Sequence, residues 1–161
     1  FYEDFAKTVC TIQISWSGTQ RMVRSLVDFL GNGTFPTPTQ VLDAGESKLR
    51  EKIRLGFRAP QLLEATQTML DQELMDTHGR ESGENITYEE LIGMRGIGPY
   101  SASHVMMMMH DFSRIPIDSA VTRHYRNRHG LKSDEIDPFL SNWGNYRALG
   151  HYLQRREISN I

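Results

Sequence analysis

Apolar residues recur at every third or fourth position through much of the chain, which is the spacing of amphipathic helices. One such run extends from Phe5 to Ile12 and a second from Met22 to Leu30. A loop rich in glycine and proline follows at residues 31–38, where Thr37 is placed to cap a short helix and Pro38 to occupy its first position. The pattern predicts two helices, a loop and a third helix in this part of the chain.

Helical periodicity continues through the middle of the chain. The apolar positions of residues 49–53 predict a helix that ends near Gly56, and those of residues 59–74 predict a longer one. The polar stretch at 76–85 is typical of a surface loop, and the sequence Thr-Tyr-Glu-Glu at 87–90 has the form of a capping box. Helical patterns continue to the C-terminus, with no strand pattern longer than a few residues and no internal repeat, so the predicted fold class is all-α.

Length and composition support a globular protein. With 161 residues, 39% of them hydrophobic, the chain can build one core or two small helical lobes that share a cleft. It has no run of about 18 apolar residues, and its first residues lack the layout of a secretory signal. We therefore expect a monomeric intracellular protein, in the cytoplasm, nucleoid or nucleus, without a membrane partner. Because the chain begins with Phe1, we expect the native protein to extend beyond one or both ends.

Cysteine content and charge limit the chemistry. Cys10 is the single cysteine, so neither a disulfide nor a four-thiolate iron–sulfur cluster can be built from this chain. The formal net charge of −2 is unusual for a nucleic-acid partner, since phosphate binding favours a basic surface. The charge is unevenly distributed, however: the segment from Arg95 to Lys132 holds six Lys or Arg and two acidic residues, a local charge of +4.

The segment from Leu91 to Ala102 combines a short helix, a Gly-x-Gly turn and the start of another helix. Gly96 and Gly98 permit a positive φ and the close approach of another backbone. Pro99 suits the first position of the second helix, whose exposed N–H groups and dipole favour an anion such as a DNA phosphate. By itself, the Gly-x-Gly turn is equally typical of an ordinary packing corner between two helices.

The whole segment resembles the helix-hairpin-helix motif, in which Leu and an apolar residue three positions later precede Gly-Ile-Gly, an aromatic residue or Lys, Ser or Thr, and Ala. The resemblance implies that the hairpin at 91–102 binds double-stranded DNA through its phosphates. The residues implied in phosphate binding are Gly96, Gly98, Pro99 and Ser101. The resemblance also implies that main-chain carbonyls hold a monovalent cation, Na⁺ or K⁺. These carbonyls belong to Ile92, Met94 and Ile97.

A carboxylate after the hairpin separates an enzyme from a binding module. The loop at 112–119 presents Asp118 at the start of a further helix, 18 positions after Tyr100. An Asp at such a position commonly caps its helix, which is the simpler interpretation. The loop, Pro116 and the spacing resemble those of the helix-hairpin-helix (HhH-GPD) DNA glycosylases, which implies that Asp118 is catalytic as well as a cap.

This resemblance covers nearly the whole chain and is closest to the monofunctional alkyladenine-type branch that lacks an iron–sulfur cluster. It implies one glycosylase domain over residues 1–161, with a two-lobed all-α fold and a central DNA-binding cleft. In the implied reaction a flipped base leaves the sugar, and Asp118 stabilises the positive sugar or activates water. Bifunctional members carry a nucleophilic Lys at the position of Tyr100. The four lysines here lie outside the hairpin and its following helix, so water is the expected nucleophile.

Three further regions match the family more loosely. Gln13 lies where the family places the wedge that fills the space of the flipped base, although an exposed Gln is equally typical of a solvated surface. We expect Trp16 to pack in the core rather than to stack on a base. In the hairpin itself, Tyr100 is expected either to line the base pocket or to pack on its neighbours. The segment at 57–59 resembles the family's aromatic-Arg-Ala turn, and that at 146–148 resembles its terminal Tyr-Arg-x-x segment. We expect their arginines, Arg58 and Arg147, to be structural.

The predicted function is base-excision repair, by hydrolysis of the N-glycosidic bond of an alkylated purine, with mismatched thymine or uracil as the next substrate class. Arg95, Arg123 and Arg126 are candidate phosphate contacts, which a solvated helix face explains nearly as well. Three alternatives stay open: a non-catalytic helix-hairpin-helix DNA-binding module, a bifunctional glycosylase-lyase, and a helical protein whose Gly-Ile-Gly is only a corner.

Overall fold

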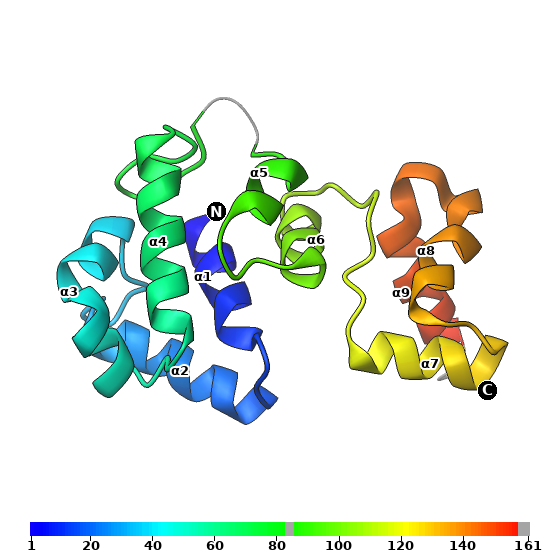
Figure 1. Cartoon of the computed structure of the whole chain (residues 1–161), viewed down its shortest axis with the longest axis horizontal. Coiled ribbons are helices and arrows are strands. Elements are labelled where there is room, and N and C mark those ends of the chain that lie inside the picture. The colour runs from blue at the N-terminus through cyan, green and yellow to red at the C-terminus, as the bar shows by residue number, and fades with distance from the viewer. Residues whose placement is uncertain (83–85, 158–161) are drawn as a thin grey trace. The chain divides into compact units, whose positions relative to one another are not determined.

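The computed structural model describes residues 1–82 and 86–157, and most of these residues are helical (Figure 1). The helices up to the hairpin turn are α1 (Tyr2–Thr11), α2 (Trp16–Phe29), α3 (Pro38–Glu51), α4 (Arg58–Asp71) and α5 (Tyr88–Gly93). The later elements are α6 (Pro99–Met108), α7 (Ser119–His129), η1 (Ser133–Glu135), α8 (Ile136–Phe139), η2 (Ser141–Tyr146) and α9 (Arg147–Glu157).

The predicted all-α class is confirmed. Extended pairing within the described residues is limited to one isolated bridge between Met75 and Glu81. This bridge lies in the predicted loop at 76–85 and its flank, of which residues 83–85 lie outside the described part of the chain. Across 1–82 and 86–157, no helix has the length and apolar character needed to cross a membrane.

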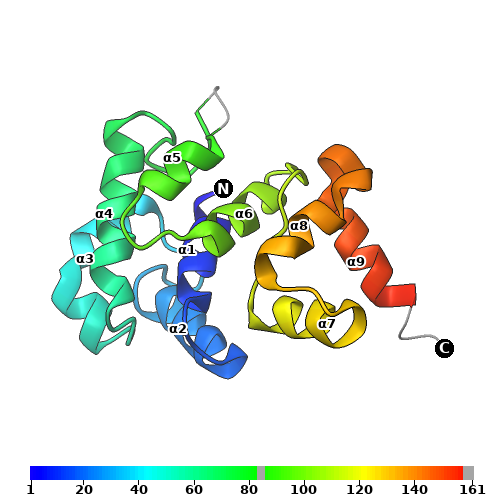
Figure 2. The same cartoon turned by 45° about the vertical axis from the view of Figure 1, so that its right-hand side comes forward.

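The chain divides into two compact units, Phe1–Ile97 and Gly98–Ile161, with the boundary inside the predicted hairpin. In the first unit, α1 packs against α2 and α4, and α3 packs against α4 (Figures 1 and 2). Phe5, Leu26 and Leu62, from three of these helices, are completely buried. Burial of each such side chain contributes about 1.5–3 kcal/mol, and this burial holds the unit together.

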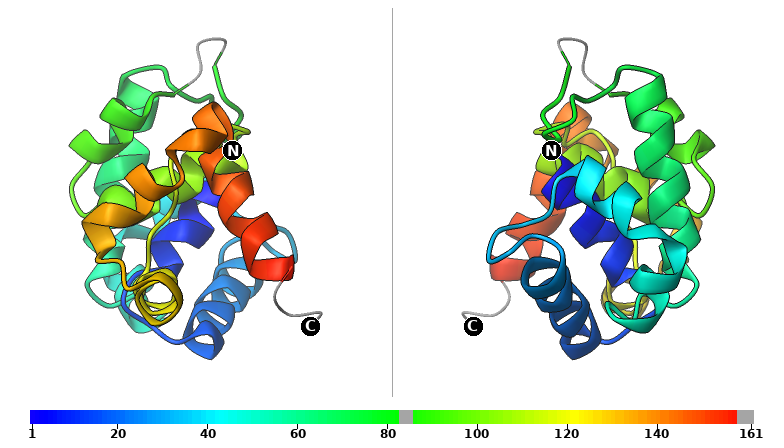
Figure 3. Two further views of the ribbon diagram at one scale, coloured as in Figure 1. Left: turned by 90° about the vertical axis from the view of Figure 1, so that its right-hand side faces the viewer. Right: turned by 90° about the vertical axis from the view of Figure 1, so that its left-hand side faces the viewer.

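The second unit has an apolar cluster of its own. Its members are Ile115, Val121, Tyr125, Ile136 and Leu140. Val121 and Tyr125 lie one turn apart on α7 and therefore share a face of that helix. The Tyr125 hydroxyl also forms a hydrogen bond with Nδ1 of His151 on α9 (3.1 Å), which links the two helices; Figure 3 shows this unit, in yellow to red, from two sides.

Helix starts follow the local sequence signals. Thr37 caps α3 and Thr87 caps α5, each within a complete capping box. The helix predicted to open at Pro38 and the helix predicted over 49–53 form one element, α3, which bends where Gly45 leaves the helical conformation (φ 68°, ψ 170°). Glycine adopts this conformation without the steric cost that a Cβ would bring.

Candidate functional site

The predicted hairpin contains a turn that requires glycine at one position. After α5, the carbonyl of Met94 accepts a hydrogen bond from the N–H of Ile97 (3.1 Å), which closes the turn. Gly96 lies inside it with a φ of 81°, and a Cβ there would collide with the side chain of Gln61 on α4. Both the backbone conformation and the close approach of α4 therefore require glycine. Gln61 could not be predicted from the sequence, because nothing in the local pattern marks a contact 35 positions away.

Gly98 does not use the positive φ that glycine permits. Its backbone is extended (φ −95°, ψ 177°), a conformation that any residue can adopt. Apart from its two chain neighbours, no described residue has an atom within 4 Å of the point where a Cβ of Gly98 would be. Gly98 is the N-cap of α6 and provides no side-chain cap, and Pro99 is the first helical residue, as predicted. The start of α6 thus combines open space with helix N–H groups that lack a side-chain cap, as an anion site requires.

The next two residues of α6 differ in exposure. Tyr100 is partly exposed, and its ring stacks on the imidazole of His104 one turn later, with 5.8 Å between centroids. Ser101 is 4% exposed. A buried hydroxyl is a poor phosphate ligand, so the predicted role of Ser101 is restricted to its backbone N–H.

Three arginines are candidate phosphate contacts. Arg95, in the turn, pairs with Glu64 of α4 (Nη1 to Oε2, 3.3 Å), and both side chains are exposed. Such a pair contributes at most about 1 kcal/mol, so an incoming phosphate can replace Glu64. Arg123 and Arg126 are exposed on α7 and form no ion pair with a described residue. Phosphate binding by the three stays a prediction.

Asp118 caps α7 through one carboxylate oxygen. Oδ1 accepts the N–H of Val121 at 2.7 Å, and the main-chain carbonyl of Asp118 accepts the hydroxyl of Thr122 at 2.9 Å. The side chain is exposed, and Oδ2 accepts no hydrogen bond from a described residue. The capping interpretation is therefore confirmed. The cap also fixes the direction of a carboxylate whose second oxygen can stabilise a positive charge or accept a proton from water.

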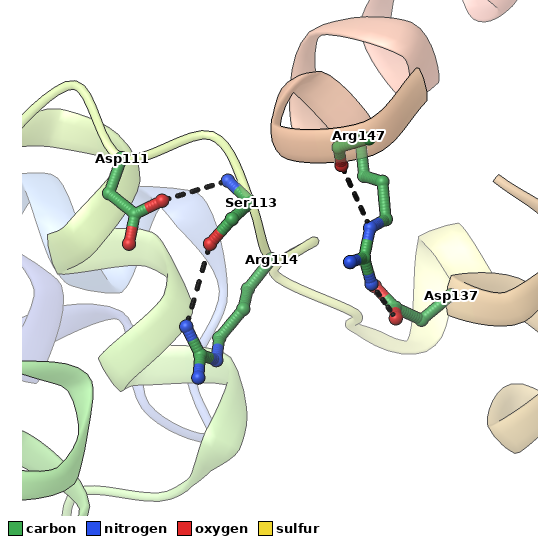
Figure 4. Close-up of polar contacts among 6 residues, drawn as sticks. Asp111, Ser113, Arg114, Asp137 and Arg147 are labelled. Atoms are coloured by element: carbon green, nitrogen blue, oxygen red, sulfur yellow. Dashed lines mark hydrogen bonds and ion pairs between the residues drawn. The ribbon is translucent and has the colours of Figure 1, made fainter. Parts of the chain in front are cut away.

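The loop before Asp118 is held by local hydrogen bonds (Figure 4). Oδ1 of Asp111 accepts the backbone N–H of Ser113 at 2.9 Å, and Nη1 of Arg114 donates to Oγ of Ser113 at 3.5 Å. Burial favours a raised pKa for Asp111, but the hydrogen bonds from Ser113 and the charge of Arg114 together bring that pKa below its usual value. Asp111 therefore stays ionised at neutral pH and keeps the start of the loop in place.

The C-terminal aromatic-Arg-Ala segment holds the same loop against α9. The N–H of Ala148 donates to the carbonyl of Phe112 at 3.0 Å. Arg147 donates through Nη1 to Oδ2 of Asp137 (2.5 Å) and through Nε to the carbonyl of Gly144 (3.0 Å), as Figure 4 shows. These contacts agree with the structural role expected of Arg147.

A buried histidine in the same unit was missed from the sequence. His151 is 1% exposed, and burial together with the nearby cation of Arg155 lowers its pKa to about 4, while the charge of Asp118 acts weakly in the opposite direction. His151 is therefore neutral near pH 7. Its partner Tyr125 lies 26 positions away, so no local pattern could have marked the pair.

In the first unit, the predicted wedge residue Gln13 is exposed between α1 and α2, with a φ of 49° that is uncommon for a residue other than glycine. Arg58 of α4, which is 5% exposed, holds this segment. Its Nε donates to the carbonyl of Ile12 at 2.8 Å, and its Nη2 donates to the carbonyl of Gln13 at 3.2 Å. Arg58 is structural, as predicted, and what it fixes is the backbone of the proposed wedge.

Trp16 was expected in the core, and the structure shows that this is wrong. Its side chain is 70% exposed at the first position of α2, and Ile14 is 41% exposed beside it. The segment from Gln13 to Trp16 therefore presents an amide, an aliphatic group and an indole to solvent. Side chains of these kinds insert between bases or stack on them in DNA-binding proteins.

The two units carry different parts of the predicted site. The first unit carries Gln13 and residues 92–97, and the second carries residues 98–101, Asp118 and the arginines of α7. The proposed wedge and the cation-binding carbonyls therefore belong to one unit, and the carboxylate belongs to the other.

No protein-family model and no curated protein matches the chain, but solved structures match it closely in shape. The 8-oxoguanine glycosylase/lyase of Clostridium acetobutylicum in its apo form covers 94% of the chain with a TM-score of 0.76 and 19% identity. The same enzyme with double-stranded DNA that contains cytosine opposite 8-oxoguanine covers 99%, with a TM-score of 0.76 and 18% identity. A 3-methyladenine DNA glycosylase from Archaeoglobus fulgidus covers 94%, with a TM-score of 0.68 and 25% identity.

The chain has the fold of the helix-hairpin-helix DNA glycosylases. This is the fold that the hairpin and the Asp118 loop predict. The chain spans 58%, 60% and 56% of the lengths of the three matched chains. The two matched enzymes are named for different bases, and one of them is named a lyase, so the shared fold is compatible with either branch.

Proposed function

We propose that this chain is a DNA glycosylase that removes a base by hydrolysis of its N-glycosidic bond. The observation that carries the proposal is Asp118, an exposed carboxylate fixed by the N–H of Val121 and with Oδ2 unbonded, within a glycosylase fold. As the base departs, the sugar gains positive charge, and an adjacent carboxylate lowers the barrier electrostatically. Through Oδ2, Asp118 also orients or deprotonates the attacking water.

The proposed partner is double-stranded DNA. The open space at Gly98 and the helix start at Pro99 support phosphate binding by the hairpin. The matched Clostridium enzyme is bound to double-stranded DNA in one of its structures. A base inside a duplex must leave the stack before its glycosidic bond can be attacked, and Gln13, on a backbone held by Arg58, is proposed to fill the space that the base leaves.

We also propose that a monovalent cation, Na⁺ or K⁺, binds the carbonyls of Ile92, Met94 and Ile97. The residues present fit such an ion. Met94 keeps a second carbonyl lone pair after it accepts the N–H of Ile97. Oε1 of Gln61, whose side chain packs at Gly96, is buried without a hydrogen-bond partner among the described residues. When bound, the cation supplies positive charge for a DNA phosphate.

Water is the proposed nucleophile, which makes the enzyme monofunctional. A strand-nicking glycosylase attacks C1′ with an amine and forms a Schiff base. Tyr100 occupies the position of that amine, and a phenol cannot form an imine. Of the four lysines, Lys132 is the one in the unit that contains Asp118, and it lies outside α6 and α7.

Alkylated purines are the proposed substrates. Alkylation of a ring nitrogen gives a purine positive charge, and the stacked rings of Tyr100 and His104 offer an aromatic surface that attracts cations. The likeness to the Archaeoglobus 3-methyladenine enzyme agrees with this choice. The likeness to the Clostridium 8-oxoguanine enzyme favours oxidised guanine as a second candidate.

The test is base release from duplexes that carry an alkylpurine, 8-oxoguanine, uracil or a mismatched thymine. Asp118→Asn keeps an oxygen that accepts the Val121 N–H but removes the charge, so base release should fall by about 10²–10³-fold while the fold is kept. Asp134→Asn, at an exposed acid in the same unit, is the matched control and should release base normally. Full activity of Asp118→Asn would reduce Asp118 to a cap, and DNA binding without release by the parent would indicate a non-catalytic module.

A further inference from the structure

A groove of about 600 Å³ lies in the first unit, between α2, the end of α3 and the turn that leads to α4. Apolar side chains, among them Ile14 and Phe29, form part of its wall, and charged side chains form the remainder. The charged lining residues are Arg21, Arg24, Asp28, Glu51, Lys52 and Arg54.

The charge of this groove is opposite to that of the chain. The whole chain has a formal charge of −2, whereas the groove has four cationic and two acidic side chains. All four cations are exposed, and none forms an ion pair with a described residue. Unpaired cations at this density attract a polyanion, because their mutual repulsion is relieved when it binds.

Arg54, one of the four cations of the groove, has an unusual backbone conformation. Its φ is 64°, in the left-handed region that a residue with a Cβ rarely occupies. Gly56, two positions later in the same turn, also has a positive φ of 60°. An arginine at a position suited to glycine is unfavourable for folding, which points to a role for its charge.

The groove adjoins the segment from Gln13 to Trp16, which carries the proposed wedge. Ile14, which directly follows Gln13, lines the groove. Arg58 joins the two borders, because Nη1 donates to the carbonyl of Leu55 (3.2 Å) at the turn and Nη2 donates to the carbonyl of Gln13 (3.2 Å). These hydrogen bonds fix the position of the turn that carries Arg54 relative to Gln13.

We propose that this groove binds the phosphodiester backbone of duplex DNA beside the wedge, as a second phosphate site separate from the hairpin. The inference rests on the proposed function, since it is DNA at the wedge that brings phosphates to the groove. Charge complementarity and continuity with Gln13 favour DNA over an acidic protein segment as the occupant.

The experiment measures the salt dependence of duplex binding for the triple variant Arg21→Gln/Arg24→Gln/Arg54→Gln. Each phosphate contact contributes about 0.9 to the slope of log Kd against log salt, so the slope should fall by about 2–3. The matched control Lys48→Gln/Arg50→Gln/Arg80→Gln removes the same charge from exposed positions of the same unit outside the groove and should change the slope by less than about 1.

Two outcomes overturn the proposal. Equal slopes for the triple variant and its control would show that DNA does not occupy the groove. Loss of binding to polyglutamate with an unchanged DNA slope would assign the groove to an acidic protein segment. Failure of the proposed function is seen separately, as absence of base release by the parent, and it does not alter the slope measured on undamaged duplex.

A single variant provides a second test. Arg54→Gly relieves the left-handed strain and removes one cation. The melting temperature of this variant should therefore rise, and its Kd for duplex DNA should increase several-fold. A rise in stability with unchanged affinity would show that the Arg54 charge has no part in DNA binding.

Discussion

At Asp118 the helix cap and the proposed chemistry use different atoms of one side chain. Oδ1 is engaged by the N–H of Val121, and Oδ2 is available to a substrate. A carboxylate that is already oriented by its own helix does not need to reorganise as charge develops on the sugar. The two roles are separable by substitution, because an amide can cap a helix but cannot supply a negative charge.

Asp118→Ala and Asp118→Asn should therefore differ in stability and agree in activity. Loss of the cap in Asp118→Ala should lower the free energy of unfolding by about 1 kcal/mol, whereas Asn, itself a favoured cap, should lower it by only a few tenths. In both variants base release should fall by about 10²–10³-fold, because both lack the negative charge. Urea denaturation monitored by circular dichroism measures the free energies of unfolding of both variants. Equal losses of stability would mean that the Val121 hydrogen bond does not stabilise α7.

The two glycines of the hairpin turn should also respond differently to alanine. Gly96→Ala should destabilise the protein by about 2 kcal/mol, because Ala is strained at a φ of 81° and its Cβ meets Gln61. Gly98→Ala should leave stability within about 0.5 kcal/mol of the parent but weaken duplex binding, since its Cβ enters the open space proposed for a phosphate. Thermal denaturation and DNA titration of both variants check this, and unchanged binding by Gly98→Ala would count against a phosphate at that point.

At the scale of elements, the second unit depends on a buried polar pair between α7 and α9. Tyr125 and His151 are almost completely inaccessible to solvent and satisfy each other's polar groups. His124, on α7, also has a pKa below its usual value, through burial and then the cations Arg155 and Arg128. Protonation of either imidazole adds a charge to a part of the unit that already contains cations.

Stability should fall as the pH falls below about 6.5, the usual pKa of histidine. Between that pH and the folded pKa of His151, about 4, the unfolded chain binds a proton that the folded chain does not, so acid favours unfolding. From pH 7 to pH 5 this lowers the free energy of unfolding by about 2 kcal/mol. Urea titrations at both pH values measure it. His151→Gln should lose this pH dependence and the exposed control His78→Gln should retain it; an equal pH dependence in both would refute the assignment to His151.

At the scale of the whole molecule, the distribution of amines and cations matters more than the net charge of −2. Four cations of the first unit that form no ion pair with a described residue line the groove beside Gln13, and the exposed arginines of α7 lie on the helix that Asp118 caps. The lysines are few and lie outside the hairpin. A nearly neutral total charge therefore conceals local surfaces suited to DNA.

The lysine distribution leads to a prediction about the reaction products. Borohydride added during turnover should trap no covalent protein–DNA adduct, and strand breakage at the product site should require hot alkali, because a hydrolytic enzyme leaves an intact abasic strand. Denaturing gel electrophoresis detects both. A trapped adduct that disappears in Lys132→Gln would instead identify that lysine as a nucleophile.

Features that depend on neighbours within about four positions could be predicted from the amino-acid sequence alone. The caps at Thr37, Thr87 and Asp118 and the helix start at Pro99 are all present, because each rests on contacts between a residue and the next turn of its own helix. The spacing from the hairpin to Asp118 likewise indicated the glycosylase fold, since both motifs are local and their separation is a property of the chain.

The exposure of these residues and the side chains that contact them depend on how the helices pack, and could not be predicted from the sequence. Trp16 was expected in the core but is exposed. Of the two glycines that permit a positive φ, only Gly96 has one, and Gln61 from another helix restricts it, whereas Gly98 is extended. The hydrogen bond from Arg58 to the carbonyl of Gln13, and the groove that Ile14 and Arg54 both line, bring together segments about 40 positions apart. Such contacts arise when helices pack, and a periodic pattern specifies which face of a helix is buried but not which helix covers it.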